Sequence, residues 1–317
     1  SAVSVGIGLF IALIGLINAG IVVDNAATLI DLRAFKDNFS TEGICAVLAL
    51  VGILITALMM IKNVKGAILF GILITWILGI LCQLIGIYDG ASLLPDFSNG
   101  LNFSGLGDVF GQVFKLDFGD ISWTQFIVVM FSFLFVDLFD TLGTLIGVAT
   151  KADMLDEEGK LPRIKGALMA DAVATTAGAV LGTSTVTTYV ESASGVTAGG
   201  RTGLTAVTTG LLFLLSIFLS PVFLAIPSFA TAPALVVVGF YMIGNVVKID
   251  FNNMLEAIPA FLAIIAMPFT YSISEGIAIG VISYTLLCLI TGNAKKQKLS
   301  PLMYVLTILF ICNYIFL

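Results

Sequence analysis

Four carboxylic acids stand inside long apolar stretches of the sequence. They are Asp137, Asp140, Asp171 and Glu191. An ionised side chain at the depth of a lipid bilayer costs at least about 2.5–3.5 kcal/mol, so such a group normally faces a cavity or a partner. No Lys or Arg stands at comparable depth in the same stretches. The remaining counterparts are a proton or a ligand that donates hydrogen bonds.

Asp137, Asp140 and Thr144 are three and four residues apart, so on a helix they form one polar stripe. Two neighbouring carboxylates in an apolar setting favour a site that takes up and releases a proton. The stripe therefore predicts proton coupling at Asp140 and Asp137. The alternative is that one of the pair, above all Asp137, only caps a neighbouring helix or binds a backbone amide.

A polar break, 183–200, interrupts the apolar stretches. Residues 185–190 are β-branched or aromatic throughout and predict a short strand. The Glu-Ser-Ala-Ser-Gly that follows looks like the start of a helix, with Glu191 or Ser192 near its cap. Broken elements of this kind mark the central binding sites of transporters, where Glu191 would accept hydrogen bonds from a ligand. The alternative is an ordinary extracellular loop with a solvated Glu191.

Small residues recur every fourth position just before the break, at Ala170, Ala174, Gly178 and Gly182. This ridge lets a neighbouring backbone approach closely. Asp171 lies beside the ridge. We expect it to form a hydrogen bond across helices, the alternative being a direct part in the site.

Several kinds of chemistry are not indicated. The sequence contains no His, and its four cysteines (Cys45, Cys82, Cys288 and Cys312) have no metal-ligand spacing. No nucleophile–base pair is evident, so an enzyme is not expected, and neither is a cofactor or a metal. The net charge of −6 and the absence of a basic stripe argue against a nucleic-acid partner.

The composition predicts an all-α, multi-pass membrane protein. Of the 317 residues, 59% are hydrophobic and only 11% are charged, and the mean hydropathy is +1.11. A spanning helix needs about 20 apolar residues. The candidate spans are 4–23, 43–62, 66–87, 124–149, 166–182, 203–225, 231–247, 255–272, 274–292 and 302–317. Helical spacing of Val109, Phe110, Val113 and Phe114 predicts a short helix on the membrane surface.

Basic residues set the expected orientation. Of the 14 Lys and Arg residues, ten fall in four loops: Lys62, Lys65, Lys151, Lys160, Arg163, Lys165, Lys248, Lys295, Lys296 and Lys298. Because cytoplasmic loops are enriched in Lys and Arg, we place these four loops in the cytoplasm, including the C-terminal basic segment 295–298. This placement assumes that 183–200 leaves the alternation of the spans unchanged.

Two motifs carry a family resemblance. The sequence FDTLGT at 139–144, followed by TTYVESASGV at 187–196, resembles the nucleobase–cation symporter-2 (xanthine/uracil permease) family. The similarity is closest to its azaguanine-type branch of hypoxanthine, guanine and adenine permeases, and it extends over essentially the whole chain. Asp140 stands where the uracil and xanthine branches have Glu, and Thr144 where the uracil branch has His. Both differences point to the purine branch.

The resemblance implies a fold of two inverted seven-span repeats, in which a core domain moves against a gate domain. On that template 1–123 supplies gate spans of the first repeat and an extracellular loop. Residues 124–225 supply core spans of the second repeat with the broken element 183–200, and 226–317 its gate spans. The chain then lacks the N-terminal part of the family fold, and the isolated chain is expected not to transport.

The resemblance also implies a function and a site. The function is import of purine bases across the cell membrane by proton symport and alternating access, with Na⁺ as another possible coupling ion and a gate-mediated homodimer as a possible assembly. Asp140, Glu191, Val190 and Thr144 would bind the base. The alternatives are a transporter of the same fold for xanthine, uracil or an anion, and an uncoupled channel.

Overall fold

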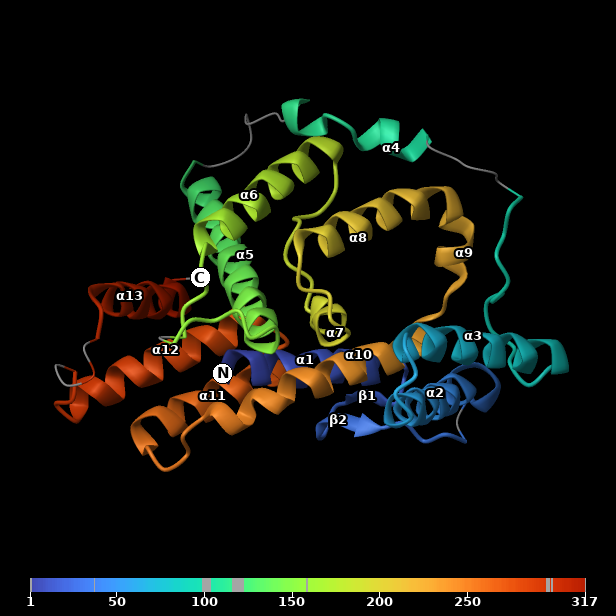
Figure 1. Ribbon diagram of the computed structural model, residues 1–317, viewed down its shortest axis with the longest axis horizontal. Coiled ribbons are helices and arrows are strands. Elements are labelled where there is room, and N and C mark those ends of the chain that lie inside the picture. Colours follow the sequence, from blue (N-terminus) through green and yellow to red (C-terminus); the bar gives the residue numbers. More distant parts are fainter. Residues whose placement is uncertain are drawn as a thin grey trace. The chain divides into compact units, whose positions relative to one another are not determined.

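The computed structural model is built almost entirely of helices (Figure 1) and describes residues 2–36, 38–98, 104–115, 123–157, 159–294, 297 and 299–316. The longer helices are α1 (Ala2–Asn18), α2 (Ile44–Ile61), α3 (Ala67–Ile85), α5 (Trp123–Lys151), α6 (Ile164–Leu181), α8 (Gly203–Ser216), α10 (Ser228–Ile243), α11 (Met254–Thr270), α12 (Ile273–Ile290) and α13 (Pro301–Phe316). The shorter ones are η1 (Phe39–Gly43), α4 (Ser104–Val109), η2 (Gln112–Lys115), α7 (Ser192–Thr197), η3 (Ile217–Leu219), α9 (Ser220–Ala225) and η4 (Gly244–Lys248).

The ten apolar stretches of the sequence all form helices, which confirms the multi-pass helical fold. Six helical segments within the described residues are long and apolar enough to cross a membrane. They are Phe39–Ile61, Ala67–Ile85, Ile164–Leu181, Gly203–Ala225, Ser228–Lys248 and Ile273–Ile290. A helix pairs its backbone N–H and C=O groups with each other, and lipid offers these groups no hydrogen-bond partners.

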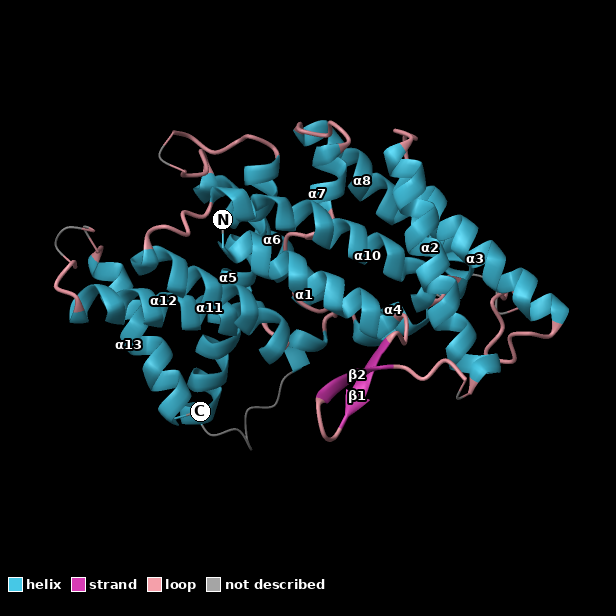
Figure 2. Cartoon of the chain, turned by 90° about the horizontal axis from the view of Figure 1, so that it is seen from below, coloured by secondary structure: helices cyan, strands magenta, loops and turns pink. Residues whose placement is uncertain are grey.

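One expectation on local structure needs correction here. The surface helix expected around 109–114 is two short pieces, because α4 ends at Val109 and the chain turns at Gly111 with a φ of +71° before η2. Such a φ suits glycine and stops a regular helix. The structure also contains an unexpected antiparallel hairpin of β1 (Val22–Asn25) and β2 (Leu29–Leu32), which Figure 2 shows as the paired arrows.

The chain divides into two compact units. One comprises Ser1–Phe10, Ser104–Ala193 and Met242–Leu317, and the other comprises Ile11–Phe103 and Ser194–Tyr241. In the second unit, α2 and α3 pack through a reciprocal pair of glycines and threonines. A Cβ added at Gly71 would collide with Thr56, and one added at Gly52 would collide with Thr75. Each threonine hydroxyl is bonded to a carbonyl of its own helix at 2.7 Å, so no polar atom opposes the close approach.

In the first unit, α11 and α12 form an antiparallel pair (Figures 1 and 2). Gly276 of α12 lies so close to α11 that an added Cβ would stand 2.9 Å from the carbonyl oxygen of Ala263. The start of α1 belongs to this unit as well, where the Ser4 hydroxyl accepts a buried hydrogen bond of 2.7 Å from the Asn245 amide. The basic residues Lys295, Lys296 and Lys298 lie outside the described residues.

Candidate functional site

The first part of the broken element, 183–193, belongs to the first unit together with α5 and α6. Helix α6 ends at Leu181, and Gly182 turns the chain with a φ of +80°. An extended segment, 183–189, leads from this turn to the short helix α7 (Figure 1). The predicted break is thus confirmed. We refer to residues 183–191 as the crossing segment.

The strand expected within this segment is wrong, since 185–190 pairs with no other strand in the described part of the chain. β-branched residues favour extended backbone, but a strand also needs a partner ladder. Hydrogen bonds with side chains on α5 and α6 hold the segment in place of a strand ladder.

Asp137 on α5 is tied to the crossing segment. Its Oδ1 accepts a hydrogen bond of 2.8 Å from the Thr185 hydroxyl. From α6, the Thr175 hydroxyl donates to the carbonyl oxygen of Val186 at 2.7 Å. These two contacts hold successive residues of the segment from two helices.

A second group of contacts is centred on Thr141, which is fully buried. Its hydroxyl donates to Oδ2 of Asp171 at 3.0 Å and lies 2.8 Å from the hydroxyl of Thr187. The bond between α5 and α6 confirms the expected role of Asp171 as a hydrogen-bonding partner across helices. It also links Asp171, through Thr141, to the crossing segment.

Asp140 differs from the two neighbouring aspartates. Its Oδ1 is buried, and no hydrogen-bond partner for that atom exists among the described residues. A buried polar atom without a partner costs about 1–3 kcal/mol, so this oxygen calls for a proton or a donor from a ligand. Thr144, one turn further along α5, is only 2% exposed.

Val190 and Glu191 lead into α7. The Val190 side chain is 7% exposed, and its carbonyl oxygen accepts a bond of 3.0 Å from the Ala193 amide. Glu191 directly precedes the first helical residue, Ser192, and is exposed. Hydrogen bonds of Asp137 and Thr141 connect the polar stripe on α5 to the crossing segment. That segment ends in Val190 and Glu191.

Two glycines of the small-residue ridge let other segments approach α6. A Cβ added at Gly178 would lie 2.8 Å from Oγ1 of Thr183 and 3.2 Å from Cγ2 of Val186. One added at Gly182 would lie 2.6 Å from the Val109 carbonyl oxygen. The ridge thus accommodates the crossing segment and the end of α4.

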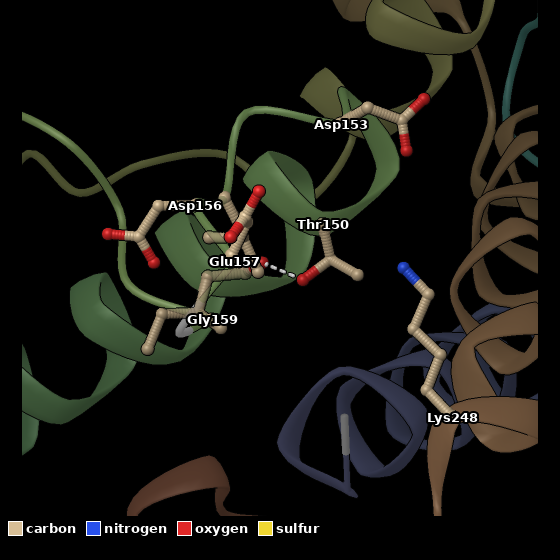
Figure 3. A pocket seen from close by; sticks show the side chains of 8 residues that line it. Thr150, Asp153, Asp156, Glu157, Gly159 and Lys248 are labelled. Atoms are coloured by element: carbon tan, nitrogen blue, oxygen red, sulfur yellow. Dashed lines mark hydrogen bonds between the residues drawn. The ribbon is translucent and has the colours of Figure 1, made fainter.

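A separate pocket of about 470 Å³ lies at the C-terminal end of α5 (Figure 3), and none of the predicted site residues lines it. In Figure 3 the Lys248 side chain points toward Thr150, and the side chains of Glu157 and Asp156 lie on the other side of Thr150. The pocket is lined by Ile146, Thr150, Asp153, Leu155, Asp156, Glu157, Gly159 and Lys248. Within the described residues, no three His, Cys, Asp or Glu side chains group together in a way that could hold a metal ion.

Four threonines that form these contacts were not among the predicted site residues, namely Thr141, Thr175, Thr185 and Thr187. The sequence does contain a signal for two of them. Thr185 and Thr187 are two residues apart, which places both side chains on the same side of an extended chain. Their partners could not be read from the sequence, since they lie 46 and 48 residues away.

Comparison with known proteins agrees with this architecture. Residues 2–279 match the family model described as Permease family. A protein of Methanocaldococcus jannaschii named as a permease is 45% identical over 99% of this chain and 68% of its own length. The adenine permease AdeP of Escherichia coli is 40% identical, over 98% of this chain and 66% of its own length. The guanine/hypoxanthine permease PbuO of Bacillus subtilis is 43% identical, over 97% and 68%.

The chain therefore spans about two thirds of the length of these relatives. The match to the family model covers most of its residues, and the identities are well above 30%. On this evidence, the chain is an integral membrane protein that belongs to the Permease family.

Proposed function

We propose that the protein imports purine bases across the cell membrane by proton symport and alternating access. Relatives with names that specify adenine or guanine and hypoxanthine support the substrate class. The observation that carries the coupling mechanism is the buried Oδ1 of Asp140, which has no partner among the described residues. A proton on this carboxyl group, or an N–H group of the base, supplies the missing partner.

In this proposal Asp140 binds the proton and contacts the base, and Thr144 lies one turn further along the same stripe. Glu191 accepts hydrogen bonds from N–H groups of the base, and Val190 contributes backbone at the start of α7. Asp137 is a secondary proton group, because Thr185 already occupies its Oδ1. A purine presents both N–H donors and ring-nitrogen acceptors at its edge, so acidic side chains and backbone groups together can recognise it.

The movement in this proposal is that of a core domain, 124–225, against gate spans in 1–123 and 226–317. This division follows the family resemblance. A gate-mediated homodimer is compatible with the proposal but is not required by it.

The proposed orientation places the basic loops in the cytoplasm, together with the C-terminal segment 295–298. The assumption that 183–200 leaves the alternation of the spans unchanged is wrong by count. Three apolar segments run between Lys151 and Lys248, namely α6, the run from α8 to α9, and the run from α10 to η4, and each is long enough to cross. Three crossings would put the two lysines on opposite sides, so they share a side only if 183–200 makes a crossing of its own.

The test is uptake of labelled adenine, hypoxanthine and guanine by the full-length protein and by two isosteric variants, Asp140→Asn and Glu191→Gln. Asp140→Asn should abolish the dependence of uptake on the proton gradient, because the amide cannot carry the proton. Glu191→Gln should raise KM at least tenfold, because the carboxylate acceptor is lost. Wild-type affinity and pH dependence in both variants would contradict the site.

Competition separates the other substrates. Excess xanthine, uracil or an inorganic anion should leave purine uptake largely unchanged. Stronger competition by any of these than by unlabelled purine would assign the protein to that substrate. Uptake that never exceeds the external concentration would identify an uncoupled channel.

A further inference from the structure

The crossing segment lies in register along α5. Thr185 and Thr187 are two residues apart on an extended chain, which corresponds to about 6.6 Å on one side of the backbone. Their partners Asp137 and Thr141 are four residues apart on a helix, which corresponds to about 6 Å. Because the two spacings agree, both hydroxyls reach α5 at once, at 2.8 Å each.

The chain of hydroxyls at Thr187 has a fixed direction when Asp171 is ionised. A hydroxyl group carries one hydrogen atom, and a carboxylate can only accept. Thr141 uses its hydrogen on Asp171, so Thr187 must donate to Thr141. Removing the Thr141 hydroxyl therefore breaks both bonds, whereas removing the Thr187 hydroxyl breaks only its bond to Thr141.

A third contact holds the residue between the two threonines. Thr175 of α6 donates its hydrogen to the carbonyl oxygen of Val186. The hydroxyls of Thr175 and Thr185 lie 3.4 Å apart, but both hydrogens are already used elsewhere. A slip of the segment by one residue would turn Thr185 and Thr187 away from α5 and lose these bonds together.

We propose that Thr185 and Thr187 are positioning residues, which hold the crossing segment in a single register on α5. This register fixes the backbone that leads to Val190 and Glu191 relative to Asp140, the neighbour of Thr141. The two threonines act through the segment and need not touch the base. The inference rests on the proposed purine transport, whereas the register itself can be tested without transport.

The first experiment is a double-mutant cycle on thermal stability of the purified full-length protein, using Thr141→Val and Thr187→Val singly and together. Valine has nearly the shape of threonine, so the change removes the hydroxyl with little loss of packing. Each single variant should lower Tm by about 2–4 °C. The double variant should lie close to the Thr141→Val variant, because Thr141→Val already removes the acceptor of the Thr187 hydroxyl.

The second experiment measures KM and kcat for purine uptake in Thr185→Val and Thr187→Val. Each should raise KM about tenfold while kcat changes less than threefold, and Thr185→Ser and Thr187→Ser should restore KM. The matched control is Thr176→Val, whose hydroxyl bonds, among the described residues, to the Ala172 carbonyl of its own helix at 2.8 Å. That variant should keep the wild-type KM.

The outcomes separate the two claims. Additive losses of Tm in the double variant would overturn the register, whatever uptake shows. A non-additive cycle with wild-type KM in both valine variants would overturn the positioning role. A wild-type protein that takes up no purine would overturn the proposed function instead, and the cycle would still decide the register.

Discussion

Three aspartates in the candidate site have different surroundings. Asp137 accepts a hydrogen bond from Thr185, and Asp171 accepts one from Thr141. Asp140 has a buried oxygen with no such donor among the described residues. Asp137 and Asp171 thus have a hydroxyl donor from the protein, whereas the buried oxygen of Asp140 depends on what enters the site. Asp140 is thus the residue whose state a proton or a substrate can change most.

This difference predicts unequal effects of the two isosteric changes. Asp137→Asn retains a side-chain oxygen that can accept from Thr185, so purine KM should stay within about threefold of wild type and uptake should still depend on pH. Asp140→Asn should lose the pH dependence. The measurement is initial uptake rate between pH 5 and 8 for both variants. Equal loss of pH dependence in the two variants would show that the stripe acts as one coupled pair.

At the scale of elements, the apolar stretches determined which segments are helical. Each of the ten candidate spans contains a helix, because an unbroken apolar stretch of this length has no other way to satisfy its backbone in lipid. Details within the spans depend on local residues. The run 203–225, for example, divides into α8, η3 and α9, with Pro221 near the start of α9.

Other elements could not be predicted in this way. The β1–β2 hairpin exposes Leu29, Ile30 and Leu32, so no alternation of buried and exposed positions marks it in the sequence. The β-branched residues of the crossing segment are typical of a strand. The segment is instead held by hydrogen bonds to side chains on α5 and α6. Such contacts depend on the register between segments nearly fifty residues apart.

Gly178 gives an element-scale prediction. Gly178→Ala would place a Cβ 3.2 Å from Cγ2 of Val186 and 2.8 Å from Oγ1 of Thr183, so the crossing segment must shift away from α6. We expect purine KM to rise severalfold. Gly210→Ala is the matched control, since no atom of the residues that the structure describes lies within 4 Å of its added Cβ. Because alanine favours a helix by about 0.5–1 kcal/mol over glycine, this control should retain or slightly raise Tm.

The result to be compared is purine KM in the two alanine variants, measured at equal expression. An unchanged KM in Gly178→Ala would mean that the segment tolerates displacement. The close approach to α6 would then have no part in substrate affinity.

At the scale of the whole molecule, the proposed orientation predicts which loops face the cytoplasm. In a background with the four native cysteines replaced, Glu157→Cys should resist a membrane-impermeant thiol reagent added to intact cells. Ala27→Cys, in the turn of the hairpin, should react. Both sites should react once the membrane is opened. The reverse pattern would invert the orientation, and labelling of both in intact cells would contradict the alternation of the spans.

The central claim is that the protein couples purine import to protons through Asp140. The most direct test reconstitutes the full-length protein in liposomes and follows labelled hypoxanthine, guanine and adenine under an imposed pH gradient. The account predicts accumulation above the external concentration when the outside is acidic, collapse of that accumulation by a protonophore, and no gradient-driven accumulation in Asp140→Asn. Accumulation that persists without a proton gradient, or that Asp140→Asn leaves unchanged, would contradict it.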